Sequence, residues 1–141
     1  MDVSALYSTL FRTLEDEYGP IDEDTETSIV GFTAGGPVSL SSIRAHDVFV
    51  TCELALHPEQ QASSEGLRFE LGSAGHFSLE ESREILTALG NLSLGVALGA
   101  GHRVGVSGAF DGTIELSLHS QCEFEGQAYG VYFIQPVAAA A

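Results

Sequence analysis

Five histidines are the side chains of this sequence best suited to acid–base chemistry, because the charge of an imidazole changes near neutral pH. They are His46, His57, His76, His102 and His119, and no pair has the HxxxH or HExxH spacing of a metal site. His46 stands before a predicted strand, and His102 follows a glycine-rich run. Either could serve a small hydrolase as a general base, but no nucleophile–base spacing is visible. The sequence therefore predicts no catalytic residue, and a hydrogen-bonded turn is the alternative for each histidine.

An acidic segment copies part of a calcium-binding loop. Asp22, Asp24 and Glu26 have the spacing of the first three ligands of an EF-hand loop. Thr27 and Thr33 occupy the positions at which that loop needs a glycine and a bidentate glutamate. We therefore expect a solvated acidic turn, with no metal and no cofactor.

The two cysteines, Cys52 and Cys122, are too few for the disulfide framework of a small secreted domain, and no CxxC motif occurs. Cys52 lies on the apolar side of a predicted strand, which is typical of an inert core thiol, and we expect the same of Cys122. The two could also face each other across a sheet. The first residues lack the pattern of a signal peptide, and no apolar run approaches the roughly 18 residues of a membrane span. We expect a cytoplasmic chain.

The charge of the chain is strongly negative, because 20 acids are opposed by 5 bases and lysine is absent, which gives −15 at pH 7. With no basic cluster to displace phosphate counterions or to attract anionic lipid, we expect neither nucleic acid nor membrane binding. Such a field favours a basic protein as partner, through faster encounter. Seven acids crowd into residues 15–26 without a base, and three of them are candidate contacts for that partner: Asp22, Glu23 and Asp24.

Apolar residues recur at spacings of three and four over residues 3–18, which predicts an amphipathic helix. Gly19-Pro20 ends this helix, and residues 19–26 form an acidic junction before a core over residues 27–137. A second helix is predicted after Phe77, because Ser78 and Glu81 have the spacing of a capping box. The end of the second helix stays open, since residues 92–98 also alternate as a strand would.

Alternation with period two predicts strands over residues 29–33, 48–55, 67–71, 114–124 and 129–137, separated by turns. Residues 57–66 read as a polar loop, and Gly126 marks a hairpin connection. The hydrophobic content of 44% can supply a sizeable core. The sequence therefore predicts one α+β domain over residues 1–141, in which a mixed or antiparallel sheet packs with about two helices.

Six segments stand in an order found in a known family. They are Ile29-Val-Gly-Phe32 with Gly35-Gly-Pro37, His46 to Thr51, Phe69-Glu-Leu71, Glu84-Ile-Leu86 with Leu89, Gly101-His-Arg-Val104, and Tyr129 to Gln135. In this order they resemble the suppressor-of-fused domain over about residues 26–137. The resemblance implies the mixed α/β fold of the N-terminal lobe of that family.

The resemblance also implies a binding module without chemistry. In the animal protein this lobe and a second lobe clamp a short peptide of a Gli transcription factor by strand addition. Glu70 matches an acidic residue near that groove, Phe49 stands where the family has tyrosine, and His102 lies in a turn that enters a strand. Stand-alone bacterial relatives are proposed to be immunity proteins of toxin systems.

These observations predict a non-enzymatic protein-binding module, of which an immunity-type protein that neutralises a basic toxin is one form. The expected contacts are Phe49, Glu70, Asp22, Glu23, Asp24 and His102. Two alternatives remain open. One is a small hydrolase that uses His102 or His46, and the other is a homo-oligomeric subunit that associates through an exposed edge strand.

Overall fold

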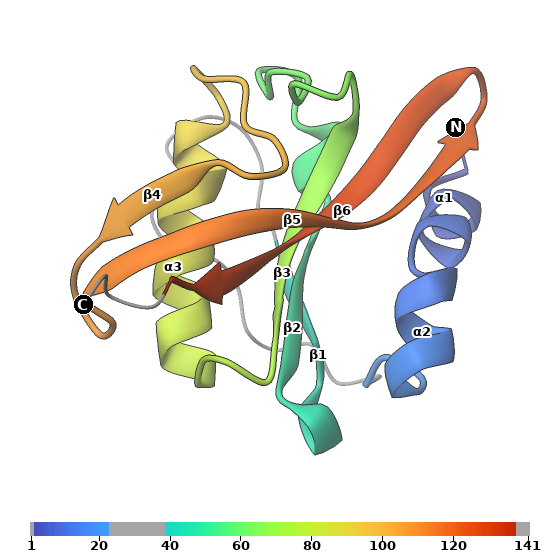
Figure 1. Cartoon of the computed structure of the whole chain (residues 1–141). Coiled ribbons are helices and arrows are strands. Elements are labelled where there is room, and N and C mark those ends of the chain that lie inside the picture. Colours follow the sequence, from blue (N-terminus) through green and yellow to red (C-terminus); the bar gives the residue numbers. More distant parts are fainter. Residues whose placement is uncertain (1, 23–38, 138–141) are drawn as a thin grey trace.

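The computed structural model of the chain describes residues 2–22 and 39–137 (Figure 1). The predicted strand over residues 29–33, the glycine-rich turn at residues 35–37, and the acids Glu23, Asp24 and Glu26 lie outside the described residues. The junction and the core predicted over residues 19–26 and 27–137 are therefore described only in part.

Two short helices stand where the sequence predicts one. They are α1 (Val3–Leu10) and α2 (Arg12–Tyr18), and Phe11 between them has φ −91° and ψ 5°. The amide of Phe11 still donates to the carbonyl of Tyr7, and its own carbonyl accepts from the amide of Glu15. The break is therefore a local bend, and Phe11 buries its ring there. Gly19, with φ 99°, ends α2 as predicted.

The sheet has six strands in the order β1-β2-β3-β6-β5-β4. The strands are β1 (Ser39–Ile43), β2 (Val48–Cys52), β3 (Arg68–Ala74), β4 (Arg103–Val106), β5 (Gly112–Phe124) and β6 (Gln127–Pro136). Neighbours are antiparallel except β3 and β6, which are parallel. The predicted α+β class with a mixed sheet is confirmed, with three helices where about two were expected.

The β5–β6 hairpin is the longest unit of the sheet and forms where alternation predicts it. Glu125 and Gly126 at its tip have φ 51° and 81°, the left-handed pair that a tight hairpin turn requires. The pairing register shifts between Leu118 and Ser120, so His119 lies in a β-bulge. Leu118 before this irregularity packs on the α3 face of the sheet, whereas Cys122 after it packs on the face of α1 and α2.

The third helix, α3 (Leu79–Leu92), begins at the predicted capping box. The Ser78 hydroxyl accepts from the amide of Glu81, and the Glu81 carboxylate accepts from the amide of Ser78. The helix ends at Leu92, which resolves the ambiguity over residues 92–98, and turns follow it up to β4.

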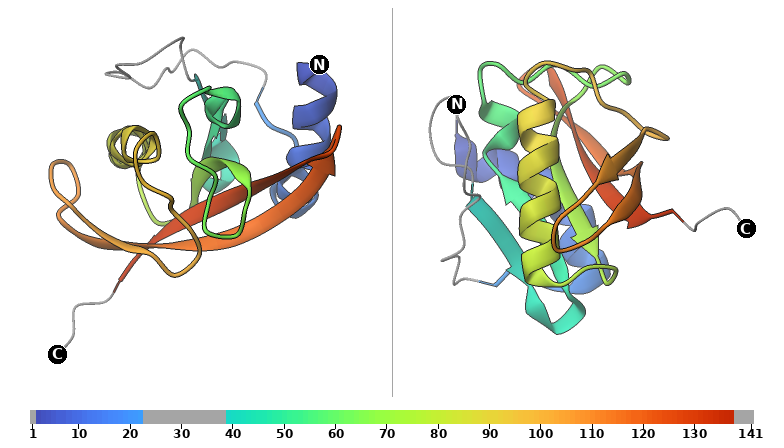
Figure 2. Two further views of the ribbon diagram at one scale, coloured as in Figure 1. Left: turned by 90° about the horizontal axis from the view of Figure 1, so that it is seen from above. Right: turned by 90° about the vertical axis from the view of Figure 1, so that its left-hand side faces the viewer.

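Two short 3₁₀ helices complete the described elements, η1 (Arg44–His46) between β1 and β2 and η2 (Leu54–Leu56) after β2. Helix α3 lies on one side of β2 and β3 in Figure 1, and α1 and α2 lie on the other side. The views in Figure 2 show the strong twist that carries the β5–β6 hairpin across both groups. In the described residues, no helix is long and apolar enough to cross a membrane.

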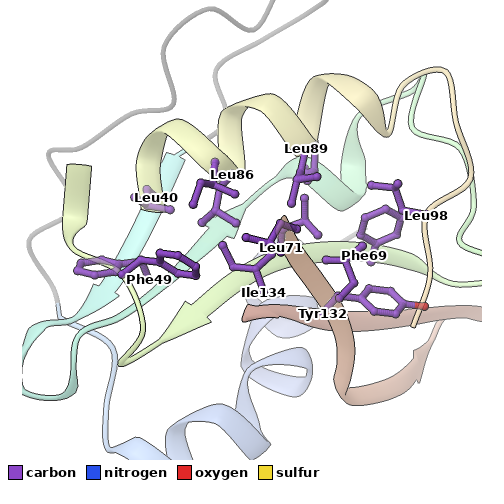
Figure 3. Close-up of a cluster of buried hydrophobic side chains, with 14 of the residues drawn as sticks. Leu40, Phe49, Phe69, Leu71, Leu86, Leu89, Leu98, Tyr132 and Ile134 are labelled. Carbon is purple, nitrogen blue, oxygen red and sulfur yellow. The ribbon is translucent and has the colours of Figure 1, made fainter. Parts of the chain in front are cut away.

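The apolar core divides into two clusters, one on each face of the sheet. Under α3, Leu86 and Leu89 face Leu71 and Ile134 of the sheet (Figure 3). The second cluster lies under α1 and α2 and consists of Leu6, Tyr7, Leu10, Phe11, Leu14, Ile43, Val48, Val50, Ala55, Tyr129, Val131 and Phe133. The helices thus cover much of the sheet but leave β4 at one open edge.

Candidate functional site

Glu70, a predicted partner contact, is fully buried under α1. Its Oε1 atom accepts from the hydroxyl of Thr51 at 2.7 Å and the amide of Leu54 at 3.1 Å. Its Oε2 atom accepts from the hydroxyl of Tyr7 at 2.7 Å and the amide of Ala55 at 2.6 Å. One carboxylate therefore joins α1, β2, η2 and β3, and in this structure it is a structural group and not a surface contact.

The same carboxylate explains why β2 ends at Cys52, while alternation predicts a strand to residue 55. The chain turns at Glu53, where φ is 79°, and so aims the amides of Leu54 and Ala55 at Glu70. The hydroxyl of Tyr7 accepts from the amide of Glu53 at 2.8 Å, which fastens the turn to α1. The amides of Leu54 and Ala55 thus donate to the Glu70 carboxylate and not to a neighbouring strand.

Burial dominates the electrostatics of this cluster. Removal from water raises the pKa of Glu70 to about 7, although its four hydrogen bonds act in the opposite direction. The neighbouring Cys52 thiol has its pKa raised to about 12, chiefly by burial and then by the charge of Glu70. Cys52 is therefore no nucleophile near neutral pH, as expected of a core thiol.

Phe49, the second predicted partner contact, is also buried, with 4% of its surface exposed. It belongs to the cluster under α3 (Figure 3), while its neighbours Val48 and Val50 point to the other face. The alternation of β2 is as predicted, but a partner has no access to Phe49 in this structure.

Two described acids, Asp22 of the predicted junction and Glu15 of α2, accept hydrogen bonds from nearby backbone amides. Asp22 accepts from the amide of Arg44 at 2.9 Å and from the hydroxyl of Ser42 at 3.3 Å, and Glu15 accepts from the amide of Ile21. These contacts attach residues 19–22 to α2, β1 and η1. Asp22 is thus half-exposed and hydrogen-bonded to β1 and η1, and the rest of the predicted acidic turn lies outside the described residues.

The two histidines that the sequence offers as possible general bases lie at the surface. His102 is exposed and His46 is exposed beside Tyr18, at a ring separation of 6.1 Å. His102 stands at a kink entering β4, where its carbonyl accepts from the amide of Leu116 and the carbonyl of Leu116 accepts from Gly101.

His119 makes contacts that the sequence spacing did not reveal. Its Nε2 atom lies 2.7 Å from the Glu17 carboxylate, its Nδ1 atom 3.3 Å from the Ser120 hydroxyl, and its ring stacks on Phe133 at 4.5 Å. The hydrogen bond to His119 is the main cause that lowers the pKa of Glu17. This Ser–His–Glu order has the atoms of a nucleophile, base and orienting acid, and it also fastens α2 to the sheet.

A groove separates α3 from β4 and has a volume of about 450 Å³. The described residues that line it are Glu84, Ile85, Ala88, Leu89, Leu92, Val104, Gly105, Val106, Ser107 and Phe110. Most of them are apolar, and Leu92 keeps 37% of its surface exposed. This groove is not among the predictions from the sequence. The signals for it are the alternation of Val104 and Val106 and the position of Leu92 beside the main apolar stripe of α3.

The backbone along this groove is open. Within the described chain β4 pairs with β5 and with no other strand. The carbonyl of Thr113 accepts from the amide of Val137, so Thr113 faces β6 and the next residue, Ile114, faces β4. Since Ile114 is opposite Val104, the amides and carbonyls of Arg103 and Gly105 point away from the sheet. These groups are available to an added strand.

Among residues 2–22 and 39–137, no cluster of three or more histidine, cysteine or acidic side chains is placed to hold a metal ion. Cys52 and Cys122 are free thiols on β2 and β5, with β3 and β6 between their strands.

Comparison with family models, with curated proteins and with solved structures finds no match for this chain.

Proposed function

We propose that this chain is a non-enzymatic protein-binding module that takes an extended segment of a basic partner into the groove between α3 and β4. The observation that carries the proposal is the open backbone of Arg103 and Gly105 beside an apolar groove. An edge strand with a groove for alternate side chains is the arrangement by which proteins bind peptides as an additional strand.

The geometry favours a short segment with apolar side chains at alternate positions. Val104 and Val106 point to the α3 side and pack against its cluster. A residue of an added strand opposite either valine points the same way, into the space lined by Leu89 and Leu92. The residue between them lies opposite Gly105, which offers a hydrogen-bonding pair and no side chain to obstruct the approach.

The charge of the chain supports a basic partner. At −15 the chain attracts cations at a distance, and a basic partner gains in association rate at low salt. The same charge disfavours nucleic acid and anionic membranes as ligands. The resemblance to suppressor-of-fused domains is a separate support, and on it we also propose that the chain is a member of that family with an immunity-type role.

A second candidate, a small hydrolase, has one observation in its favour. Ser120, His119 and Glu17 are in the order of a nucleophile, a base and an orienting acid. The histidine lies under α2 against Phe133, with 13% of its side chain exposed, which leaves little access for substrate. Hydrolysis of generic esters that disappears in Ser120→Ala would favour this candidate over the binding module.

The test uses two variants of Gly105. The Gly105 amide points away from β5, so Gly105→Pro removes a hydrogen bond to an added strand and keeps the β4–β5 pairing. Gly105→Ala retains the amide and is the matched control. A display library of random 12-residue peptides is selected on the wild-type chain, and the enriched peptides are measured against both variants.

We expect the affinity of the enriched peptides to fall about tenfold in Gly105→Pro, the equivalent of one or two hydrogen bonds. Gly105→Ala should stay within twofold of the wild type. Absence of any enriched peptide, or equal affinity for the proline variant, would contradict binding at β4. Dimerisation of the wild-type chain in sedimentation experiments, lost in Gly105→Pro, would instead assign this edge to a second copy.

A further inference from the structure

The groove between α3 and β4 has a charge at one end. Glu84 is the one charged side chain among the described residues that line it. Glu84 and Leu92 are separated by eight residues of α3, or about 12 Å along a helix. The groove is therefore apolar along most of its length and acidic at the Glu84 end.

The Glu84 carboxylate is held in place by the turn between β4 and β5. The amide of Ala109 donates to both of its oxygens, at 3.3 and 3.2 Å. Gly108 lies against it, and a side chain at that position would collide with Oε1. The amide of Gly108 in turn donates to Asp111, which fixes the turn. Each carboxylate oxygen keeps acceptor capacity beyond the one amide, so an incoming donor finds an oriented anion.

The direction of the elements places this anion relative to an added strand. Strand β4 ends at Val106 and leads into the turn whose Ala109 amide binds Glu84, so the Glu84 end of the groove lies at the C-terminal end of β4. The contact between Glu84 and Ala109 places the carboxylate beyond Val106. A strand paired with Arg103 and Gly105 points one side chain into the groove opposite Val104 and the next opposite Val106. The following groove-facing position is the one that meets Glu84.

We infer, on the basis of the proposed function, that Glu84 is a specificity-determining residue that selects an arginine or lysine in the bound segment. The segment carries two apolar residues two positions apart, opposite Val104 and Val106. The basic residue lies two positions beyond the one opposite Val106, at the Glu84 end of the groove. In an antiparallel segment the basic residue precedes the apolar pair, and in a parallel one it follows.

The contact between Glu84 and a basic residue of the segment is a local ion pair, and its effect can be separated from long-range attraction by the net charge of the chain. Arg103 lies on the other face of β4, where it pairs with Glu115 at 3.6 Å, so it does not neutralise Glu84 inside the groove. Glu80 is exposed one turn earlier on α3 and does not line the groove. It therefore has the same charge on the same helix without the proposed contact, and Glu80→Gln is the matched control for Glu84→Gln.

The experiment is a double-mutant cycle on an enriched peptide from the library above. The peptide and its version with the basic residue replaced by glutamine are titrated against the wild type, Glu84→Gln and Glu80→Gln. Glutamine at position 84 keeps an acceptor for Ala109, so the turn is preserved. We expect the basic residue to be worth about fivefold in affinity with the wild type and with Glu80→Gln, and less than twofold with Glu84→Gln. The coupling should decline between 50 and 500 mM salt, as for a partly exposed ion pair.

The outcomes separate this inference from the function on which it rests. Peptides that need the open edge at Gly105 but show no coupling to Glu84 would overturn the role of Glu84 and leave the binding module intact. The same holds for coupling of equal size in Glu80→Gln, which would assign the effect to the overall field. Peptides indifferent to Gly105→Pro, or no enrichment at all, would overturn both.

Discussion

Glu70→Gln is the substitution that most directly tests how this fold is held together. The carboxylate has no exposed surface and accepts four hydrogen bonds, two at each oxygen. Burial destabilises its charge, while the four donors stabilise it, and the first effect dominates and raises the pKa to about 7. A neutral glutamine of the same shape removes the charge and sets an NH₂ group against one hydroxyl and one backbone amide.

The magnitude follows from the pKa. A carboxyl whose pKa is about 7 in the folded chain and 4.5 when unfolded binds its proton more tightly in the folded state. Its contribution to stability is therefore full below pH 4.5 and is lost as the pH rises through 7. Between pH 5.5 and 8.5 this linkage amounts to about 2 kcal/mol, and the glutamine variant lacks it. At the acidic end glutamine should destabilise by about 1–3 kcal/mol, because one more buried donor is left without an acceptor.

The assay is urea unfolding of both proteins, followed by circular dichroism, at intervals from pH 5.5 to 8.5 in 0.2 M salt. This range avoids the isoelectric point near 4.3, where the chain loses its net charge. We expect the deficit of Glu70→Gln relative to the wild type to shrink by about 2 kcal/mol across the range. A difference that stays flat across this range would mean that the pKa of Glu70 is not raised in the folded chain, because a carboxyl with a pKa at or below 4.5 is ionised in both states above pH 5.5. A deficit that grows with pH would likewise contradict a raised pKa.

Two further predictions concern packing and the thiols. Gly72→Ala should destabilise the fold by about 1–3 kcal/mol in thermal unfolding, because its Cβ would lie 2.9 Å from the Phe49 carbonyl oxygen and 2.8 Å from the Phe133 ring. Gly105→Ala, with open space around it, should stay within about 0.5 kcal/mol, and equal losses would contradict this account. Cys52 and Cys122 lie three strand spacings apart, about 14 Å. Reductant should therefore leave the unfolding temperature of the monomer unchanged, and a reducible bond within one chain would contradict the topology.

Features governed by neighbouring residues could be predicted from the sequence. The capping box at Ser78 and the hairpin turn at Gly126 depend on contacts over three or four residues, and both occur as expected. The alternation of β5 holds only as far as Leu118, because the bulge after it moves Cys122 and Phe124 to the face covered by α1 and α2. The parallel pairing of β3 with β6 is not local, because it joins segments about 60 residues apart and no turn signal records it.

The interrupted β2 strand shows why other features could not be predicted. Its alternation continues through residue 55, but the chain turns after Cys52 because Glu70, from another strand, provides an acceptor for two amides. A lone glutamate amid apolar residues predicts a surface position by composition alone, whereas its four donors come from α1, β2 and η2. The groove was missed for a related reason, since it exists only where α3 and β4 meet.

Most of the predicted contact residues that the structure describes instead make contacts within the fold, with partners that are distant in the sequence. Phe49 and Glu70 are expected contacts only on the basis of a resemblance, and Asp22 is expected because it belongs to a run of acids. The first two are buried and Asp22 is engaged with β1 and η1. Of the described residues in that set, His102 alone is exposed. Residue type alone therefore does not distinguish a buried structural position, such as that of Phe49 or Glu70, from a surface contact.

The shortage of bases gives the acids of this chain an unusual set of partners. Within the described residues, Arg103 forms an ion pair with Glu115, and His119 forms one with Glu17 when its imidazole is protonated. Acidic side chains instead accept from backbone amides at loops, turns and helix ends, at Ala5, Ile21, Arg44, Leu54, Ala55, Ser78, Ala100, Gly108 and Ala109. Such contacts satisfy amides that would otherwise lack a partner, without neutralising the acid. The fold can therefore use its carboxylates as structural acceptors while the chain keeps a formal net charge of −15.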